Sequence, residues 1–186
     1  MKFDDSFLDE LETLRGRLRA LELKLGAAER EALPDHDFDV LLTESYGARL
    51  AFRLDQVRVV VPAAELAPLP EAPEWLLGLL TLRGRSIPAV DVATRLGANG
   101  RRLDPSDLIV VTETHGRELA FVVQRVDGVT AVRRDSVESS VHETPHAPYV
   151  LGTFHDDGQS VLVIGISHLV GQLSELGVGR VEAEAS

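Results

Sequence analysis

The stretch PLPEAPEWLLGLLTLRGRSIPAVDVATRL, residues 68–96, carries the clearest structural signal in this chain. Two apolar runs, 76–82 and 87–92, stand on either side of a single Arg83-Gly84 pair. Glycine adopts positive φ without steric cost, so Arg83-Gly84 is typical of a tight turn between two strands. Pro88 lacks a backbone donor, which places the second strand at a sheet edge or at a bulge. The stretch is therefore predicted to be a β-hairpin.

Short strands are predicted on both sides of this hairpin. Residues 49–54 and 57–62 are predicted to form a hairpin across Asp55-Gln56. A loop rich in Gly, Asn and Arg follows at 96–106 and separates two halves. The later predicted strands are 107–112, 118–124, 126–133, 149–154 and 160–166. Many short strands with turn signals at this spacing indicate a mainly β barrel or sandwich.

Helices are predicted at both ends of the chain. The N-terminal segment 1–34 carries apolar residues at alternating steps of four and three, which is the pattern of an amphipathic helix and of a coiled coil. These residues are Phe7, Leu11, Leu14, Leu18, Leu21 and Leu25. Such a helix either dimerises with a second copy or packs back on its own domain. Pro34 ends it, and residues 35–47 are predicted to be an acidic linker.

A shorter helix is predicted to follow the last strand. Ser167 is its N-cap and Gly177 ends it. The residues from 177 to 186 carry no core signal and are expected to be a flexible tail. The main domain is therefore expected over 48–176.

Composition excludes several classes of function. The net charge of -11 argues against nucleic acid and against anionic membranes, because phosphate groups are bound by Lys and Arg. The absence of cysteine excludes disulfides, thiol nucleophiles and cysteine metal ligands. The opening MKFDD lacks the basic start of a secretory signal, and no apolar run reaches the ~18 residues of a membrane span. We therefore expect a cytoplasmic protein.

The order of the strand motifs is similar to that of the CheW-like coupling domains of bacterial chemotaxis. The matching pieces are VVVP at 59–62, PLP at 68–70, LGLLTLRG at 77–84, IPAVDV at 87–92, FVV at 121–123, VDGV at 126–129 and VLG at 150–152. The resemblance covers about residues 48–171. Thr81 replaces the asparagine of the family motif. The segment 63–67 is shorter than its family counterpart, which helps to form the surface for chemoreceptor tips.

The resemblance implies a fold of two small five-stranded SH3-like barrels packed together. It implies a non-enzymatic adaptor, without cofactors, that couples chemoreceptors to the regulatory domain of a CheA-type histidine kinase. The implied partner-binding residues are Arg83, Gly84, Leu82, Leu80, Gly78, Glu65 and Gly152. The residue chemistry agrees, because an arginine between apolar strand residues is typical of an interface hot spot. The alternative is an internal salt bridge from Arg83 to Asp91 or Glu74.

Other functions remain open from the sequence. The adaptor could serve a pilus-motility or other alternative chemosensory system, or be a divergent coupler that has lost receptor binding. It could also be a structural oligomerisation protein built on the N-terminal helix. A metal-dependent enzyme would use His142, His146 and His155. Trp75 is either a core residue or an exposed anchor for a partner.

Overall fold

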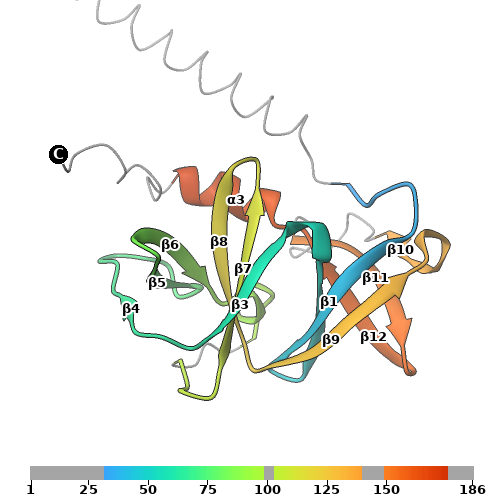
Figure 1. The fold of residues 1–186 in the computed structure, drawn as a ribbon, viewed down its shortest axis with the longest axis horizontal. Helices are drawn as coiled ribbons and strands as arrows, with labels where there is room; N and C mark the ends of the chain where they lie inside the picture. The colour runs from blue at the N-terminus through green and yellow to red at the C-terminus, as the bar shows by residue number, and fades with distance from the viewer. Residues whose placement is uncertain (1–31, 99–102, 140–148, 176–186) are drawn as a thin grey trace, which may run out of the picture. The chain divides into compact units, whose positions relative to one another are not determined.

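The computed structural model describes residues 32–98, 103–139 and 149–175 of the 186-residue chain. The chain divides into two units, residues 1–30 and 31–186, and the description that follows concerns the second. The predicted N-terminal helix and the predicted tail both lie outside the described residues. The described unit is mainly β, with two six-stranded sheets side by side (Figure 1).

The first sheet has the strand order β10-β11-β12-β2-β1-β9. Its strands are β1 (Phe38–Ser45), β2 (Ala48–Arg53), β9 (Arg125–Val132), β10 (Glu138–Ser139), β11 (Val150–Asp156) and β12 (Gln159–Ile164). All neighbouring strands are antiparallel except β12 and β2, which pair in parallel with Leu162 opposite Leu50. The 3-10 turn η2 (Arg134–Ser136) joins β9 to β10, and α3 (Ser167–Glu175) follows β12.

The second sheet has the strand order β3-β7-β8-β6-β5-β4. Its strands are β3 (Val57–Pro62), β4 (Leu66–Ala67), β5 (Leu76–Leu82), β6 (Arg85–Val90), β7 (Leu108–Thr114) and β8 (Arg117–Val123). Again one pair is parallel, β6 with β8. The 3-10 turn η1 (Leu54–Gln56) leads into β3, and the short helix α2 (Val92–Arg95) follows β6. Each sheet thus has five strands of six to eight residues and one two-residue strand at its edge.

The two halves of the chain exchange hairpins. The β1–β2 hairpin of the first half pairs with β9 and β12 of the second, while the β7–β8 hairpin of the second half pairs with β3 and β6 of the first. The two hairpins also share a sequence, LLTESYGARLAF at 41–52 and VVTETHGRELAF at 110–121, with six of twelve positions identical. Thr43 Oγ1 donates to the Leu50 carbonyl at 3.2 Å, and Thr112 Oγ1 to the Leu119 carbonyl at 3.3 Å. The fold is therefore an internal duplication with swapped hairpins.

The main core lies where the exchanged hairpins meet. Phe52 of β2 and Phe121 of β8 occupy equivalent positions in the repeat, are 1% and 0% exposed, and have ring centroids 4.9 Å apart. Helix α3 covers this core with Leu169 and Leu173, both buried. Two smaller buried clusters are each formed by residues of one sheet, one in the first sheet and one in the second. Burial of apolar surface in these three clusters is the main stabilising term of the fold.

The structure corrects two predictions. The segment 35–47 is not a linker, because residues 38–45 form β1, which pairs with strands on both sides. The apolar run Val40–Leu42 is short and flanked by acidic residues, which hid the strand in the sequence. The strands around Asp55 do not form a hairpin either. Strand β2 pairs with β1 and β12, β3 pairs with β7, and η1 carries the chain from one sheet to the other.

Candidate functional site

The hairpin predicted around Arg83-Gly84 is confirmed, since β5 and β6 pair antiparallel with Leu82 opposite Arg85. Arg83 and Gly84 have φ angles of 51° and 78°, the signs that a type I′ turn requires. Leu76, Gly78 and Leu80 of β5 are buried, and this alternation fixes the register because a slip of one residue would expose this face. The turn therefore holds Arg83 at a defined place at the tip of a rigid hairpin.

The Arg83 side chain is exposed, and within the described part of the chain it makes no ion pair or hydrogen bond. The alternative salt bridge to Asp91 or Glu74 is not found among these residues. Asp91 is buried and accepts instead from Tyr46 Oη at 2.8 Å and from Thr94 Oγ1 at 2.7 Å. The Arg83 guanidinium thus keeps its donors available to a partner.

Arg83 also carries local backbone strain. A positive φ costs a side chain other than Gly, Asn or Asp about 1–2 kcal/mol. The equivalent turn of the repeat, between β11 and β12, has Asp157 at this position, with φ of 49° and the preferred Asp-Gly sequence. The arginine is therefore a less stable choice for the turn than the residue found in its counterpart.

We expect Arg83→Asn to raise the free energy of unfolding by about 0.5–1 kcal/mol, because asparagine tolerates the left-handed conformation. Thermal unfolding should then shift upward by about 1–4 °C. His115→Asn is the matched control, since His115 takes the same place in the β7–β8 turn with φ of 49°. A gain at His115 without one at Arg83 would show that the arginine makes a stabilising contact in the free protein.

The other residues proposed for this site lie in the hairpin or beside it, and they differ in burial. Leu80 is 2% exposed, and Gly78 is buried and has no side chain, so neither residue can contact a partner through a side chain. Strand β4 passes so close to Gly78 that a Cβ there would lie 2.5 Å from the Ala67 carbonyl oxygen. Leu82 is half-buried, Gly84 is exposed in the turn, and Glu65 is exposed just before β4. Arg83 and these five residues thus lie around one hairpin edge.

Gly152 is the exception, because it lies in β11 of the other sheet. A Cβ on Gly152 would meet the Glu138 carbonyl oxygen of β10 at 2.7 Å. Both glycines follow a register shift, between Leu76 and Gly78 and between Val150 and Gly152. Gly152 is therefore the counterpart of Gly78 in the duplication and does not belong to the Arg83 surface.

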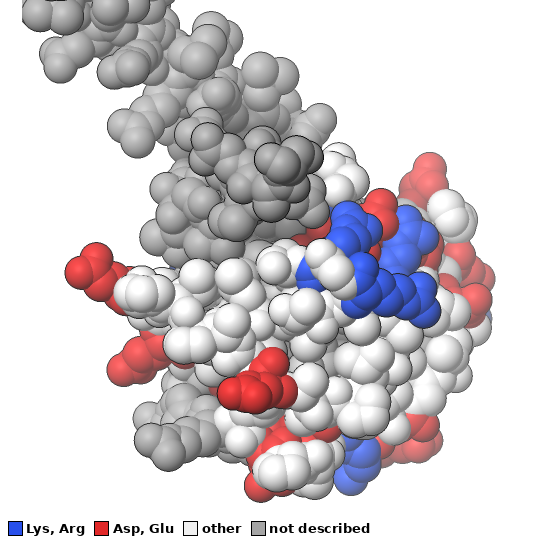
Figure 2. All heavy atoms as spheres, turned by 60° about the vertical axis from the view of Figure 1, so that its left-hand side comes forward, with Lys and Arg blue, Asp and Glu red and all other residues white. Residues whose placement is uncertain are grey.

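The surface around the hairpin carries little charge. Figure 2 shows the side of the molecule with β4, β5 and β6, where uncharged side chains cover much of the middle, acidic groups lie at the left edge, near the centre and along the bottom, and a group of basic residues lies at the upper right. The exposed residues that surround β4 include Pro62, Ala64, Ala67 and Pro68. In a chain of net charge -11, an uncharged face with an unpaired arginine at its rim suits contact with another protein.

Sequence reasoning missed a cluster that joins the two halves. The Arg95 guanidinium of α2 lies over the rings of Trp75 and Tyr149, 5.4 and 4.3 Å from their centroids. It donates to Tyr149 Oη and, at 3.2 Å, to Oε1 of Gln172 in α3. Trp75 is half-buried and packs on the main core, which favours the core interpretation of this residue. No sequence signal pointed to the cluster, because its members come from four separate segments.

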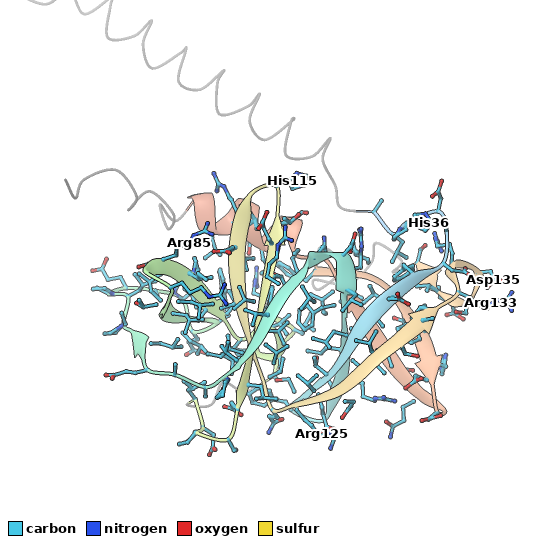
Figure 3. The ribbon with its side chains drawn as sticks, in the orientation of Figure 1. His36, Arg85, His115, Arg125, Arg133 and Asp135 are labelled. Atoms are coloured by element: carbon cyan, nitrogen blue, oxygen red, sulfur yellow. The ribbon has the colours of Figure 1, made fainter. Side chains whose placement is uncertain are left out.

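The structure offers little for metal or acid–base chemistry. His142 and His146 lie outside the described residues, and His155 is exposed beside Ser160. No group of three His, Asp or Glu side chains in the described part of the chain is placed to hold a metal ion. Among the described residues, two pKa values are shifted at exposed sites outside the hairpin, that of Asp35 beside His36 and that of Arg125 (Figure 3). A hydrogen bond with His36 lowers the pKa of Asp35, and one with Asp127 raises the pKa of Arg125.

Comparison with known proteins places the chain beside chemotaxis proteins. The model of the CheW-like domain family matches residues 39–174. The chemotaxis protein CheW of Thermotoga maritima is 26% identical over 140 residues, which cover 74% of this chain and 91% of that protein. CheW of Treponema pallidum is 25% identical over 145 residues, covering 74% and 85%.

A solved structure shows the same fold. The scaffolding protein TtCheW of Thermoanaerobacter tengcongensis superposes with a TM-score of 0.64 at 23% identity. The match covers 69% of this chain and 88% of the other.

No helix in the described residues is both long and apolar enough to cross a membrane.

Proposed function

This chain belongs to the family of CheW-like domains, and from that premise we propose that it couples chemoreceptors to a CheA-type histidine kinase. Proteins of this family are scaffold adaptors of chemotaxis and not enzymes, and this chain is one of them. The family match runs through both sheets, so it supports the whole two-sheet scaffold. Each sheet, with its five longer strands, is the counterpart of one five-stranded barrel, and the protein works in the cytoplasm.

The kinase regulatory domain is the proposed partner of the Arg83 hairpin. The supporting observation is that Arg83 is exposed and unpaired in the described chain, on a turn that holds it despite backbone strain. A guanidinium presents several donors in a fixed plane and pairs well with a carboxylate at an apolar interface. Leu80 and Gly78 are buried in β5, the strand that leads to Arg83, and Glu65 lies just before the edge strand β4.

The test is calorimetric binding to the regulatory domain of a chemosensory kinase from the same organism. We expect Arg83→Asp to weaken binding at least about tenfold, as loss of a hot-spot residue does. Aspartate keeps the turn, because Asp157-Gly158 forms the equivalent one. Arg133→Asp is the control, with the same change of charge at a side chain that is 74% exposed. Equal binding by wild type and both variants would remove Arg83 from the interface.

The receptor contact is a separate part of the proposal. Only Ala63, Ala64 and Glu65 separate β3 from β4, so the segment that forms the receptor surface in the family is short here. This observation motivates a second candidate, a divergent coupler that binds the kinase but not the receptor. Receptor-tip fragments titrated in the same calorimeter distinguish the two forms of the adaptor. Homodimerisation through the N-terminal helix stays a prediction, since that helix lies outside the described residues.

A further inference from the structure

Two equivalent hairpins, β5–β6 and β11–β12, lie on opposite sides of the described unit (Figure 1). At the base of the first hairpin, the Asp91 N–H donates to the Trp75 carbonyl at 2.8 Å. At the base of the second, the Gly165 N–H donates to the Tyr149 carbonyl at 2.9 Å. The two bonds occupy the same place in the duplication, so Trp75 and Tyr149 are equivalent residues, each directly before the first strand of its hairpin.

One side chain joins the two hairpin bases. The guanidinium of Arg95 lies over both aromatic rings, 5.4 Å from the centroid of Trp75 and 4.3 Å from that of Tyr149. Arg95 also donates to Tyr149 Oη and to Gln172 Oε1, and Tyr149 Oη itself donates to Gln172 Oε1 at 3.1 Å. The Arg95 cluster (Trp75, Arg95, Tyr149 and Gln172) therefore connects the base of the Arg83 hairpin with the base of its counterpart and with α3.

Packing alone does not account for an arginine at this place. The equivalent residue in the other half is Leu169, which is 0% exposed in the main core. Arg95 is half-buried and makes no ion pair within the described chain, where its buried Nε also has no hydrogen-bond partner. A buried donor without a partner costs free energy, and a leucine would not have this cost. What the arginine adds is the link between the two hairpin bases.

We propose that Arg95 is a positioning residue, which holds the Arg83 hairpin at a fixed orientation relative to the first sheet. This inference rests on the proposed function, in which Arg83 at the tip of the hairpin contacts the kinase. Trp75 comes directly before β5, and α2 with Arg95 begins one residue after β6, so the cluster grips the hairpin where both of its strands start and end. The tip is about 20 Å from this base, at about 3.3 Å per residue. A small rotation at the base therefore moves Arg83 beyond hydrogen-bond distance of its partner.

Binding rates separate positioning from direct contact. Without the cluster, the hairpin is correctly placed in only a fraction of the molecules, and the apparent Kd rises by the inverse of that fraction. We expect Arg95→Leu to raise the Kd for the kinase regulatory domain about three- to tenfold, mainly through slower association. Arg83→Asp removes a contact instead and should mainly speed dissociation. Surface plasmon resonance measures both rates.

The orientation of the hairpin can also be measured without the kinase. The chain has no cysteine, so Ser86→Cys and Ser160→Cys place two spin labels at equivalent exposed positions of β6 and β12. Pulsed electron–electron double resonance on the full-length chain, diluted with unlabelled protein, gives the distribution of distances between the two hairpins. We expect a narrow distribution with Arg95 and a broader one with Arg95→Leu. Tyr149→Phe removes the Oη but keeps the ring and should also broaden it, which provides a second variant if Arg95→Leu fails to fold.

Arg134→Leu is the matched control, because Arg134 is also a half-buried arginine in a short helical turn, where it donates to the Val137 carbonyl at 3.3 Å. It should leave the distance distribution and both binding rates unchanged. An unchanged distribution in Arg95→Leu would overturn the proposal, and so would a broader distribution with binding rates equal to those of wild type. A wild-type chain that binds no kinase would contradict the proposed function instead, and the spin-label distances would still decide whether Arg95 positions the hairpin.

Discussion

Phe121→Ala is expected to lower the free energy of unfolding by about 3–5 kcal/mol. Phe121 is 0% exposed and lies where the two exchanged hairpins meet, with its ring against that of Phe52. Removing the ring leaves a cavity that β8, paired on both edges, cannot easily close, and Phe52 loses its ring contact. A domain of ordinary stability has only about 5–15 kcal/mol, so the variant should lose a large share of its stability.

Denaturation in urea measures this loss, and a double-mutant cycle with Phe52→Ala isolates the contact between the rings. We expect the double variant to be more stable than the sum of the single losses predicts, by about 0.5–1.5 kcal/mol. Val60→Ala is the control, because Val60 is 36% exposed and should change stability by less than about 0.5 kcal/mol. Strict additivity of the two phenylalanine substitutions would mean that the hairpins are joined by other contacts.

Gly78→Ala is expected to destabilise the protein by about 2–4 kcal/mol. Gly78 has a φ of 142°, which side chains rarely adopt, and its added Cβ would lie 2.5 Å from the Ala67 carbonyl oxygen. Relief of this contact requires β4 to leave β5, since no flexible side chain is there to move. The loss should appear as a thermal midpoint lowered by about 4–16 °C.

Gly171→Ala is the matched control for Gly78. Gly171 lies in α3 with no atom within 4 Å of an added Cβ, so alanine should stabilise the helix by about 0.5–1 kcal/mol. The same substitution thus has opposite effects at the two sites. An unchanged midpoint for Gly78→Ala would show that β4 separates from the sheet at little cost, and that this glycine has no structural role.

Local signals predicted the parts of this fold that are formed by neighbouring residues. The Arg83-Gly84 turn and its two strands were predicted because alternation and turn chemistry act over a few positions. Strand β1 was missed because both of its faces are packed: Leu41 lies in the main core and Val40 and Leu42 in a second cluster, so Val40–Thr43 are all buried and do not alternate. The repeat LLTESYGARLAF and VVTETHGRELAF was readable in the sequence, but where each copy pairs depends on contacts far along the chain.

The candidate site was predictable to a similar degree. The sequence identified the hairpin with Arg83 at its tip, and family resemblance supplied the glycines. The sequence could not show that Gly152 and Gly78 lie in different sheets. Each glycine makes room for a two-residue edge strand, and this common role is visible only once both sheets are formed. The Arg95 cluster depends on side chains from α2, α3 and two further segments. Spacing along a sequence does not predict contacts between residues that lie so far apart in the chain.

The exchange of hairpins sets the order in which a growing chain can become a folded protein. The first half leaves the ribosome with the β1–β2 hairpin lacking its two outer neighbours, β9 and β12, and β2 gains its parallel partner only when Val161–Val163 emerge. Until then, apolar strands wait without their sheet, for seconds at ordinary rates of synthesis. A nascent chain that stops before β12 therefore lacks a complete first sheet, although every strand of the second sheet has been made by Val123.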